Sequence, residues 1–188
     1  MALIRKVRGH EPVIGENTFL AETAVILGDV TIGRDCSIWY NAVLRGDVNR
    51  IVIGDRTNIQ DGVVLHTIYD KAKHPSQTII GNDVSVGHNA IIHGAVIGDN
   101  CLIGMGATLL DNARIPSGCI IAANALVLSN AQLEPNSVYA GVVQKGGAHA
   151  DQAVVADDSA VDDGVVADRH VVADDGLRRV FGLVVNRM

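Results

Sequence analysis

The stretch IGNDVSVGHNAIIHGAVIGDNCLIGMGATL, residues 80–109, carries the pattern that decides the fold. An aliphatic residue recurs in it about every six positions, at Ile80, Val86, Ile92, Ile97, Ile103 and Leu109. Counted outward, the same spacing runs from Ile14 to Leu133. We define this aliphatic residue as position 1 of a hexad. A six-residue period fits neither a helix nor a single amphipathic strand, but it fits short strands separated by turns, each strand forming one side of a prism.

Three hexads per coil predict an all-β fold, a triangular parallel β-helix, over residues 1–145. Position 2 of the hexad is often glycine, and position 5 is small. All three cysteines, Cys36, Cys101 and Cys119, fall at position 5, and the count also places Val48 and Val96 there. We therefore expect these five side chains to face the core. The odd number of cysteines and the lack of a C-x-x-C motif favour reduced thiols over disulfides or a zinc knuckle.

Composition supports a long stack and excludes several classes of partner. Aromatic residues make up 3% of the 188 residues, and 20 glycines stand against 4 prolines, so small and branched aliphatic side chains must fill the interior. A formal net charge of -6 argues against nucleic acid or an anionic membrane as partner. We find neither a signal-peptide pattern nor an uninterrupted apolar run long enough for a membrane span. The expected location is cytoplasmic.

The repeat slips at three places before residue 100. Three extra residues fall between Leu44 and Ile53, around residues 48–52, and nine fall between Leu65 and Ile80, whereas one residue is missing between Ile92 and Ile97. Extra residues in a solenoid leave as loops on one face, where binding usually occurs. The nine-residue excess therefore predicts an external loop.

Residues 146–188 differ in composition from the rest of the chain. They are rich in Ala, Val and Asp, and they show neither the hexad nor a clean helical period. An acidic tail and valine-rich segments packed along the prism are both compatible with this composition, and the sequence leaves the choice open.

Counting hexads places the histidines of the repeat on two sides of the prism. Arg45, His66 and His93 occupy position 2 of successive coils on one side, spaced by about 4.8 Å. Asp61 and His88 share position 3 on an adjacent side. His66 and His93 are close enough to share a zinc ion at about 2.0 to 2.1 Å each. His88 would join them only from a neighbouring chain packed around a threefold axis.

Several motifs together resemble the γ-class carbonic anhydrases and their carbonic-anhydrase-like relatives. The motifs are Arg45-Gly46-Asp47, Asn58-Ile59-Gln60-Asp61, His66, the VGHNAIIHG segment that holds His88 and His93, and GMGA at 104–107. The resemblance covers about residues 8–145. It implies a left-handed coil and a homotrimer, with an interfacial metal bound by His66 and His93 of one chain and His88 of the next.

The resemblance also implies catalytic roles for five polar residues. Gln60 hydrogen-bonds near the metal-bound water, Asn58 lines the pocket, and Arg45, Asp47 and Asp61 hold the interface and orient the site. From the residue types alone, an ion pair between Arg45 and Asp47 across the chain interface is expected. The implied reaction is zinc-dependent hydration of carbon dioxide to bicarbonate, in which the ion lowers the pKa of bound water from 15.7 to about 7. Imidazole ligands would also suit Fe²⁺ or Co²⁺.

Two other functions remain open at this stage. One is a hexapeptide acyltransferase, in which a single histidine acts as general base on a coenzyme A thioester. The other is a metal-binding trimer without useful catalysis. In the best-characterised active members a glutamate in an acidic loop carries the proton away, whereas here the corresponding loop holds Asp70, Lys71, Lys73 and His74. No tyrosine follows Tyr139, where the family's C-terminal helix usually brings one toward the site.

Overall fold

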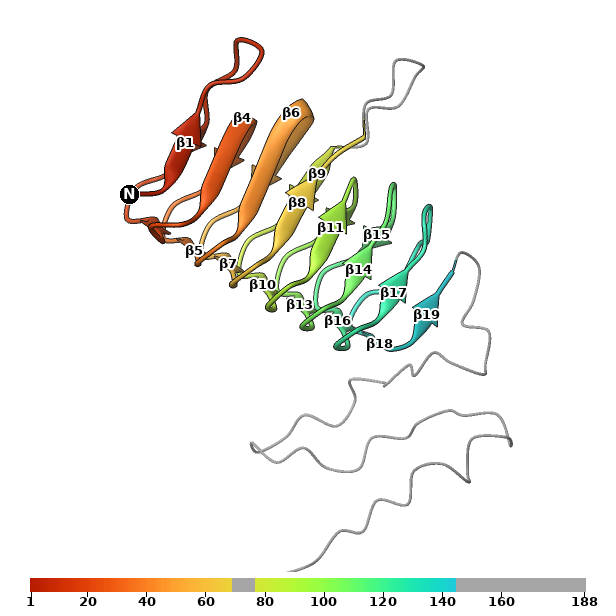
Figure 1. Cartoon of the computed structure of the whole chain (residues 1–188). Coiled ribbons are helices and arrows are strands. Elements are labelled where there is room, and N and C mark those ends of the chain that lie inside the picture. Colours follow the sequence, from red (N-terminus) through yellow and green to blue (C-terminus); the bar gives the residue numbers. More distant parts are fainter. Residues whose placement is uncertain (69–76, 145–188) are drawn as a thin grey trace, which may run out of the picture.

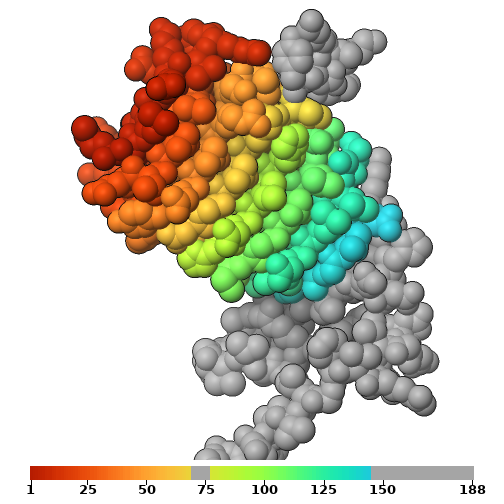
Figure 2. Space-filling model, in the orientation of Figure 1, coloured from red at the N-terminus to blue at the C-terminus, as the bar shows by residue number. Residues whose placement is uncertain are grey.

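The computed structural model, which describes residues 1–68 and 77–144, shows a parallel β-helix (Figure 1). Every pair of named strands in these ranges is parallel, and none of the described residues is helical. Successive coils lie side by side along the axis and form the regular ridges in Figure 2. The fold therefore confirms the β-helix that the hexad period predicts.

The strands form three sides, which we number in the order in which the chain first meets them in a full coil. The first side contains β1 (Leu3–Arg5), β4 (Val25–Ile32), β6 (Val43–Ile53), β8 (Val64–His66), β11 (Ile91–His93), β14 (Thr108–Leu109), β17 (Leu126–Val127) and β19 (Val142–Val143). The second contains β2 (Val13–Ile14), the distal halves of β4 and β6, β9 (Thr78–Ile80), β12 (Val96–Ile97) and β15 (Arg114–Ile115). The third contains β3 (Phe19–Leu20), β5 (Ser37–Ile38), β7 (Asn58–Ile59), β10 (Ser85–Val86), β13 (Leu102–Ile103), β16 (Ile120–Ile121) and β18 (Val138–Tyr139).

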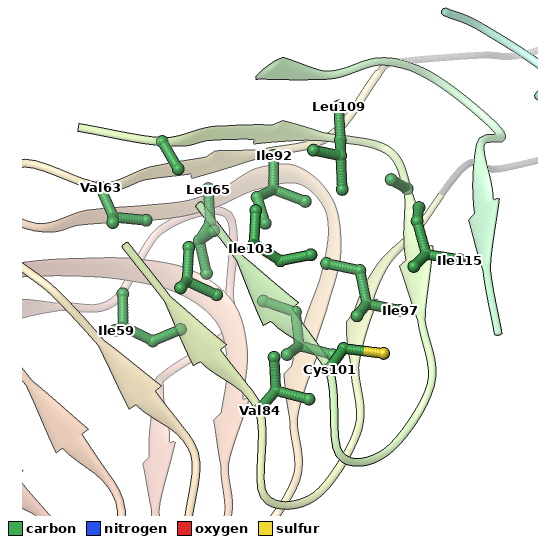
Figure 3. Close-up of a cluster of buried hydrophobic side chains, with 14 of the residues drawn as sticks. Ile59, Val63, Leu65, Val84, Ile92, Ile97, Cys101, Ile103, Leu109 and Ile115 are labelled. Atoms are coloured by element: carbon green, nitrogen blue, oxygen red, sulfur yellow. The ribbon is translucent and has the colours of Figure 1, made fainter. Parts of the chain in front are cut away.

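The position-1 side chains form the core. In the middle coils they are almost completely buried, and in Figure 3 they point inward from all three sides toward one another. On the first side, Leu44 pairs with Leu65, and Leu65 with Ile92, so equivalent side chains stack from coil to coil. This stacking transmits the register of one coil to the next, and it decides which outward residues become neighbours.

Position 5 behaves as predicted except beside two of the slips. Cys36, Cys101 and Cys119 are buried free thiols, and burial raises the pKa of Cys101 to about 11. Val48 and Val96 are only partly buried, so the predicted inward placement of these two is wrong. Ala95 is fully buried in place of Val96, because the shortened hexad moves the inward position back by one residue.

Glycine at position 2 lets neighbouring coils approach closely. A Cβ atom on Gly98 would lie 2.6 Å from the backbone nitrogen of Ser117 in the next coil, which is too close for any side chain. On the first side the same position carries outward side chains instead, including Arg45, His66 and His93. These residues therefore stand out from the backbone in one column.

The slips place irregular segments beside this column. The pairing of β4 with β6 shifts between Gly28↔Gly46 and Val30↔Ile51, so the extra residues form a bulge at 47–50, slightly earlier than predicted. Most of the predicted nine-residue loop, residues 69–76, lies outside the described residues, as does the segment 146–188. In the described ranges, no helix is long and apolar enough to cross a membrane.

Candidate metal centre

Two imidazoles meet at the ends of adjacent strands on the first side. His66 ends β8 and His93 ends β11, and the two residues are directly paired, as the hexad count predicts. The Nδ1 atom of His66 lies 3.1 Å from the Nε2 atom of His93. Their rings are tilted by 59°, with centroids 5.1 Å apart. Two ring nitrogens from successive coils therefore point at the same small space.

Each ring has a carboxylate at its other nitrogen. The Nε2 atom of His66 lies 3.1 Å from Oδ1 of Asp47, and the Nδ1 atom of His93 lies 2.7 Å from Oδ1 of Asp111. A carboxylate accepts hydrogen bonds, so in the neutral rings it fixes the proton on the nitrogen that faces it. The nitrogens that face each other, Nδ1 of His66 and Nε2 of His93, are then both lone-pair donors.

Arginine completes the network on one side of the pair. Arg45 donates from Nη1 to both oxygens of Asp47, at 3.1 and 3.0 Å. The two side chains thus form an ion pair within one chain. The ion pair that the residue types predict across a chain interface stays a prediction.

Burial and a nearby positive charge favour the neutral form of His66. Desolvation and the positive charge of Arg45 lower the pKa of His66 and outweigh the opposing effect of Asp47. Burial alone would raise the pKa of Asp47, but the hydrogen bonds from Arg45 and His66 reverse this effect and lower it. A neutral imidazole beside an ionised carboxylate is the form of histidine that binds metals.

The remaining candidate residues lie on or beside the third side. His88 follows β10, and its Nδ1 atom lies 3.0 Å from Oδ2 of Asp61, which follows β7. Both side chains are about half exposed. The carboxylate of Asp61 therefore lies beside Nδ1 of His88, and Nε2 is the ring nitrogen turned away from it. Asn58, at the start of β7, and Gln60 share this side.

The structure therefore divides the candidate residues into two half-sites. The first-side half-site consists of Arg45, Asp47, His66, His93 and Asp111, and the third-side half-site consists of Asn58, Gln60, Asp61 and His88. Within the described part of the chain, no three histidine, cysteine or acidic side chains converge in a geometry that could hold a metal ion.

Three residues that belong to these half-sites or contact them are not predicted from the sequence. Asp111 lies one coil beyond His93 and could have been found by asking which acidic residue follows each histidine by one turn of the prism. Ser37 and Trp39 both donate to the side-chain oxygen of Asn58, at 2.8 and 2.7 Å. From its residue type Trp39 is expected to be a packing residue, and no sequence signal distinguishes the two roles.

A polar hollow of about 240 Å³ adjoins the first-side half-site. Asp47 and Asn49 line it from the bulge of β6, and Asp29 lines it from β4. Arg8 and His10 reach it from the turn after β1, where Val7 and His10 form an isolated bridge. Asp47 therefore touches His66 on one side and a water-accessible space on the other.

Comparison with known proteins identifies the class to which the fold belongs. The family model for the bacterial transferase hexapeptide, a unit of six repeats, matches residues 11–46 and 77–111. A crystal structure of a candidate acetyltransferase from Bacillus cereus superimposes with a TM-score of 0.71 at 40% identity, covering 75% of this chain and 79% of that one. The chain is thus a hexapeptide-repeat protein.

Sequence relatives define the family within that class. A probable carbonic anhydrase of Methanocaldococcus jannaschii is 55% identical over 130 residues, which span 69% of this chain and 79% of the relative. Gamma carbonic anhydrase 1, a mitochondrial protein of Arabidopsis thaliana, is 48% identical over 103 residues, or 53% of this chain and 37% of that protein. The chain therefore spans well under half of this plant relative. It belongs to the family of γ-class carbonic anhydrases and carbonic-anhydrase-like proteins.

Proposed function

We propose that this protein is a zinc-dependent carbonic anhydrase that hydrates carbon dioxide reversibly to bicarbonate. The observation that carries the proposal is the facing pair of lone-pair nitrogens on His66 and His93, each imposed by a carboxylate on the far side of its ring. Two lone pairs 3.1 Å apart repel each other unless a proton or a metal ion lies between them.

The distance between these nitrogens suits zinc. Two ligands at about 2.0 to 2.1 Å from a tetrahedral ion are separated by about 3.3 Å. The observed 3.1 Å is within a few tenths of an ångström of this value. Carboxylates that orient ligating histidines through the second ring nitrogen are also the usual outer partners of zinc sites. The donor set therefore fits the ion, although imidazole would also accept Fe²⁺ or Co²⁺.

The third ligand in this proposal is His88 of a neighbouring chain. Asp61 lies 3.0 Å from Nδ1 of His88, so Nε2, which is turned away from the carboxylate, is the nitrogen that would bind the metal. Because His88 lies on the third side and the pair on the first, one chain would supply the two half-sites to two different centres.

Exposed apolar side chains flank both half-sites and support a homotrimer. Val64 and Ile91 stand on the first side, 36% and 42% exposed, and Leu102 and Met105 stand on the third, 46% and 56% exposed. Burying two different patches against each other makes a head-to-tail contact, which closes into a ring when the rotation permits. On a triangular prism, a ring of three chains would place each first side against a third side. The three free thiols suit a reducing, cytoplasmic compartment.

When bound, zinc supplies a water with a pKa near 7, and hence a nucleophile at neutral pH. The residues of the chain would orient the histidine ligands and stabilise the charges around the site. Asp47 and Asp111 would keep His66 and His93 in the ligating tautomer, and Arg45 keeps Asp47 ionised. Asp61 lies beside the ring of His88. Gln60 and Asn58 present amides on the third side, where the substrate would lie. The hollow beside Asp47 gives protons a path to bulk water.

The two alternatives make different predictions. An acyltransferase needs one histidine as general base. That role does not require His66 and His93 to face each other with their lone pairs, so only the fold supports the acyltransferase alternative. A metal-binding trimer without catalysis would bind zinc in the same way but would lack hydration activity.

Zinc analysis and stopped-flow carbon dioxide hydration on the purified full chain test the proposal. We expect one zinc per chain, and loss of both zinc and activity in His66→Ala, His93→Ala and His88→Ala. His10→Ala is the matched control, since His10 is not one of the three proposed ligands, and it should retain its zinc. Zinc without hydration would favour the non-catalytic trimer, and absence of zinc would refute the proposal.

A mixing experiment tests ligation across chains. His66→Ala and His88→Ala chains, unfolded together and refolded as mixed trimers, should regain zinc at interfaces where an intact first-side half-site meets an intact third-side half-site. If mixed trimers form and bind no zinc, the proposed division of the ligands between chains is wrong.

A further inference from the structure

The side-chain oxygen of Asn58 is held by two donors. The Oγ atom of Ser37 donates to it at 2.8 Å, and the indole Nε1 of Trp39 donates to it at 2.7 Å. A carbonyl oxygen has two lone pairs, so both are used. The two N–H donors of the amide must then point away from Ser37 and Trp39.

Neighbouring strands hold both donors in place. Ser37 is directly paired with Asn58 in the ladder between β5 and β7. The Trp39 ring packs against Phe19, with centroids 5.3 Å apart and a tilt of 53°. Trp39 is 37% exposed, so its ring lies along the surface of the third side rather than in the core. Packing against Phe19 therefore holds the indole in place, and its N–H donates to Asn58 from the preceding coil.

We propose that Ser37 and Trp39 are positioning residues that turn the Asn58 amide so that its N–H groups bind an oxygen of bicarbonate. The inference rests on the proposed function and extends it to the recognition of the anion. An amide is nearly symmetric in shape, and its two orientations differ only in which end carries the donors. Turned the other way, Asn58 would present its oxygen to an anion and repel it.

The location of Asn58 supports a ligand-binding role over a purely structural one. Its side chain points outward from β7, on the side that also carries His88 and Asp61. Asp61 lies three residues further along the chain, and its negative charge would repel a bound bicarbonate. This half-site therefore needs hydrogen-bond donors held in a fixed orientation to bind the anion. Two oriented N–H groups on a neutral side chain supply such a donor without adding a charge.

The test uses Trp39→Phe, Ser37→Ala and the double variant. Phenylalanine keeps the contact with Phe19 and removes only the indole N–H. Each hydrogen bond contributes a net bias of about two- to tenfold to the orientation of the amide. In each single variant the remaining hydrogen bond still favours the oriented amide, so we expect the KM for bicarbonate in the dehydration direction to rise by less than about 1.5-fold. In the double variant neither orientation is favoured, and the KM should rise about twofold, while kcat and zinc content stay unchanged. Tyr40→Phe, which removes a hydroxyl from the neighbouring aromatic residue, is the matched control and should leave KM unchanged.

A second readout does not depend on activity. Trp39 is the only tryptophan of the chain, so intrinsic fluorescence reports directly on the group that holds Asn58. Bicarbonate added to the intact trimer should change this fluorescence saturably. In Asn58→Asp, which keeps the oxygen that accepts from Trp39 but loses the amide donors, the saturable change should disappear.

The outcomes separate this inference from the proposed function. If wild-type protein hydrates carbon dioxide but the double variant of Ser37→Ala and Trp39→Phe keeps its KM for bicarbonate, the positioning role is refuted. A fall in zinc content or trimer stability without a change in KM would also refute it, because that result indicates a structural role. If the wild type lacks hydration activity yet shows the Asn58-dependent fluorescence change, the proposed function fails and the anion site remains.

Discussion

Replacing Asp111 with asparagine tests the tautomer argument directly. The 2.7 Å hydrogen bond from Nδ1 of His93 is charge-assisted and only partly exposed to solvent. An asparagine would accept that proton weakly, or, with its amide turned round, donate to Nδ1 and move the ring proton to Nε2, the nitrogen that faces His66. Loss of such an outer partner lowers metal affinity by about 10- to 100-fold, which corresponds to about 1.4 to 2.7 kcal/mol.

The assay is competition for zinc between a chelator of known affinity and the metal-free protein at neutral pH. Asp83→Asn is the matched control, because Asp83 pairs with Arg56 at a corner of the prism and forms no ion pair with a histidine of the described ranges. The reasoning is wrong if Asp111→Asn binds zinc as tightly as the wild type, or if Asp83→Asn loses as much affinity. Unchanged circular dichroism in both variants would show that the coil itself is intact.

Three further predictions concern stability. Because the pKa of His66 is lowered, its imidazole binds a proton more readily in the unfolded chain than in the folded metal-free protein, so the unfolding free energy should fall as the pH drops through about 6.5. The lowered pKa of Asp47 should add a second loss of stability below about pH 3.9. Thermal unfolding of the metal-free protein across this range checks the prediction, and an equal dependence of the thermal midpoint on pH in His66→Gln would contradict it. Ile103→Ala, at a fully buried position, should cost about 2 to 5 kcal/mol in denaturant unfolding, whereas Val13→Ala, at a position 60% exposed, should stay within about 0.5 kcal/mol. Gly98→Ala should lower the thermal midpoint, because the new Cβ would lie 2.6 Å from the backbone of the next coil; an unchanged midpoint would mean that the coils can separate at little cost.

Much of the fold follows from counting along the sequence. Each coil repeats the same three short strands, so a position-1 residue stays in its column until the period slips. This is why the hexad count alone places His66 and His93 side by side, although they are 27 residues apart in the chain. The same count fails for Val48 and Val96, which lie beside slips where the backbone regains its register within one or two residues.

The contacts that define the half-sites are harder to predict. Asp111 follows His93 by 18 residues, but the shortened hexad between them moves it to a different position of the repeat, so the hexad position alone does not pair the two residues. The indole of Trp39 crosses from its own coil to Asn58 in the next. Such contacts depend on side-chain torsions, which a backbone period does not encode.

The division of the candidate residues between two sides of the prism has a consequence for gene dosage. Under the proposed assembly every metal centre contains residues of two polypeptides. A chain defective in both half-sites would therefore inactivate two centres of the trimer that it joins. In a mixed population the share of intact centres would then fall with the square of the fraction of normal chains. A single defective allele would therefore act as a dominant inhibitor, and the protein would tolerate loss of expression better than expression of a damaged copy.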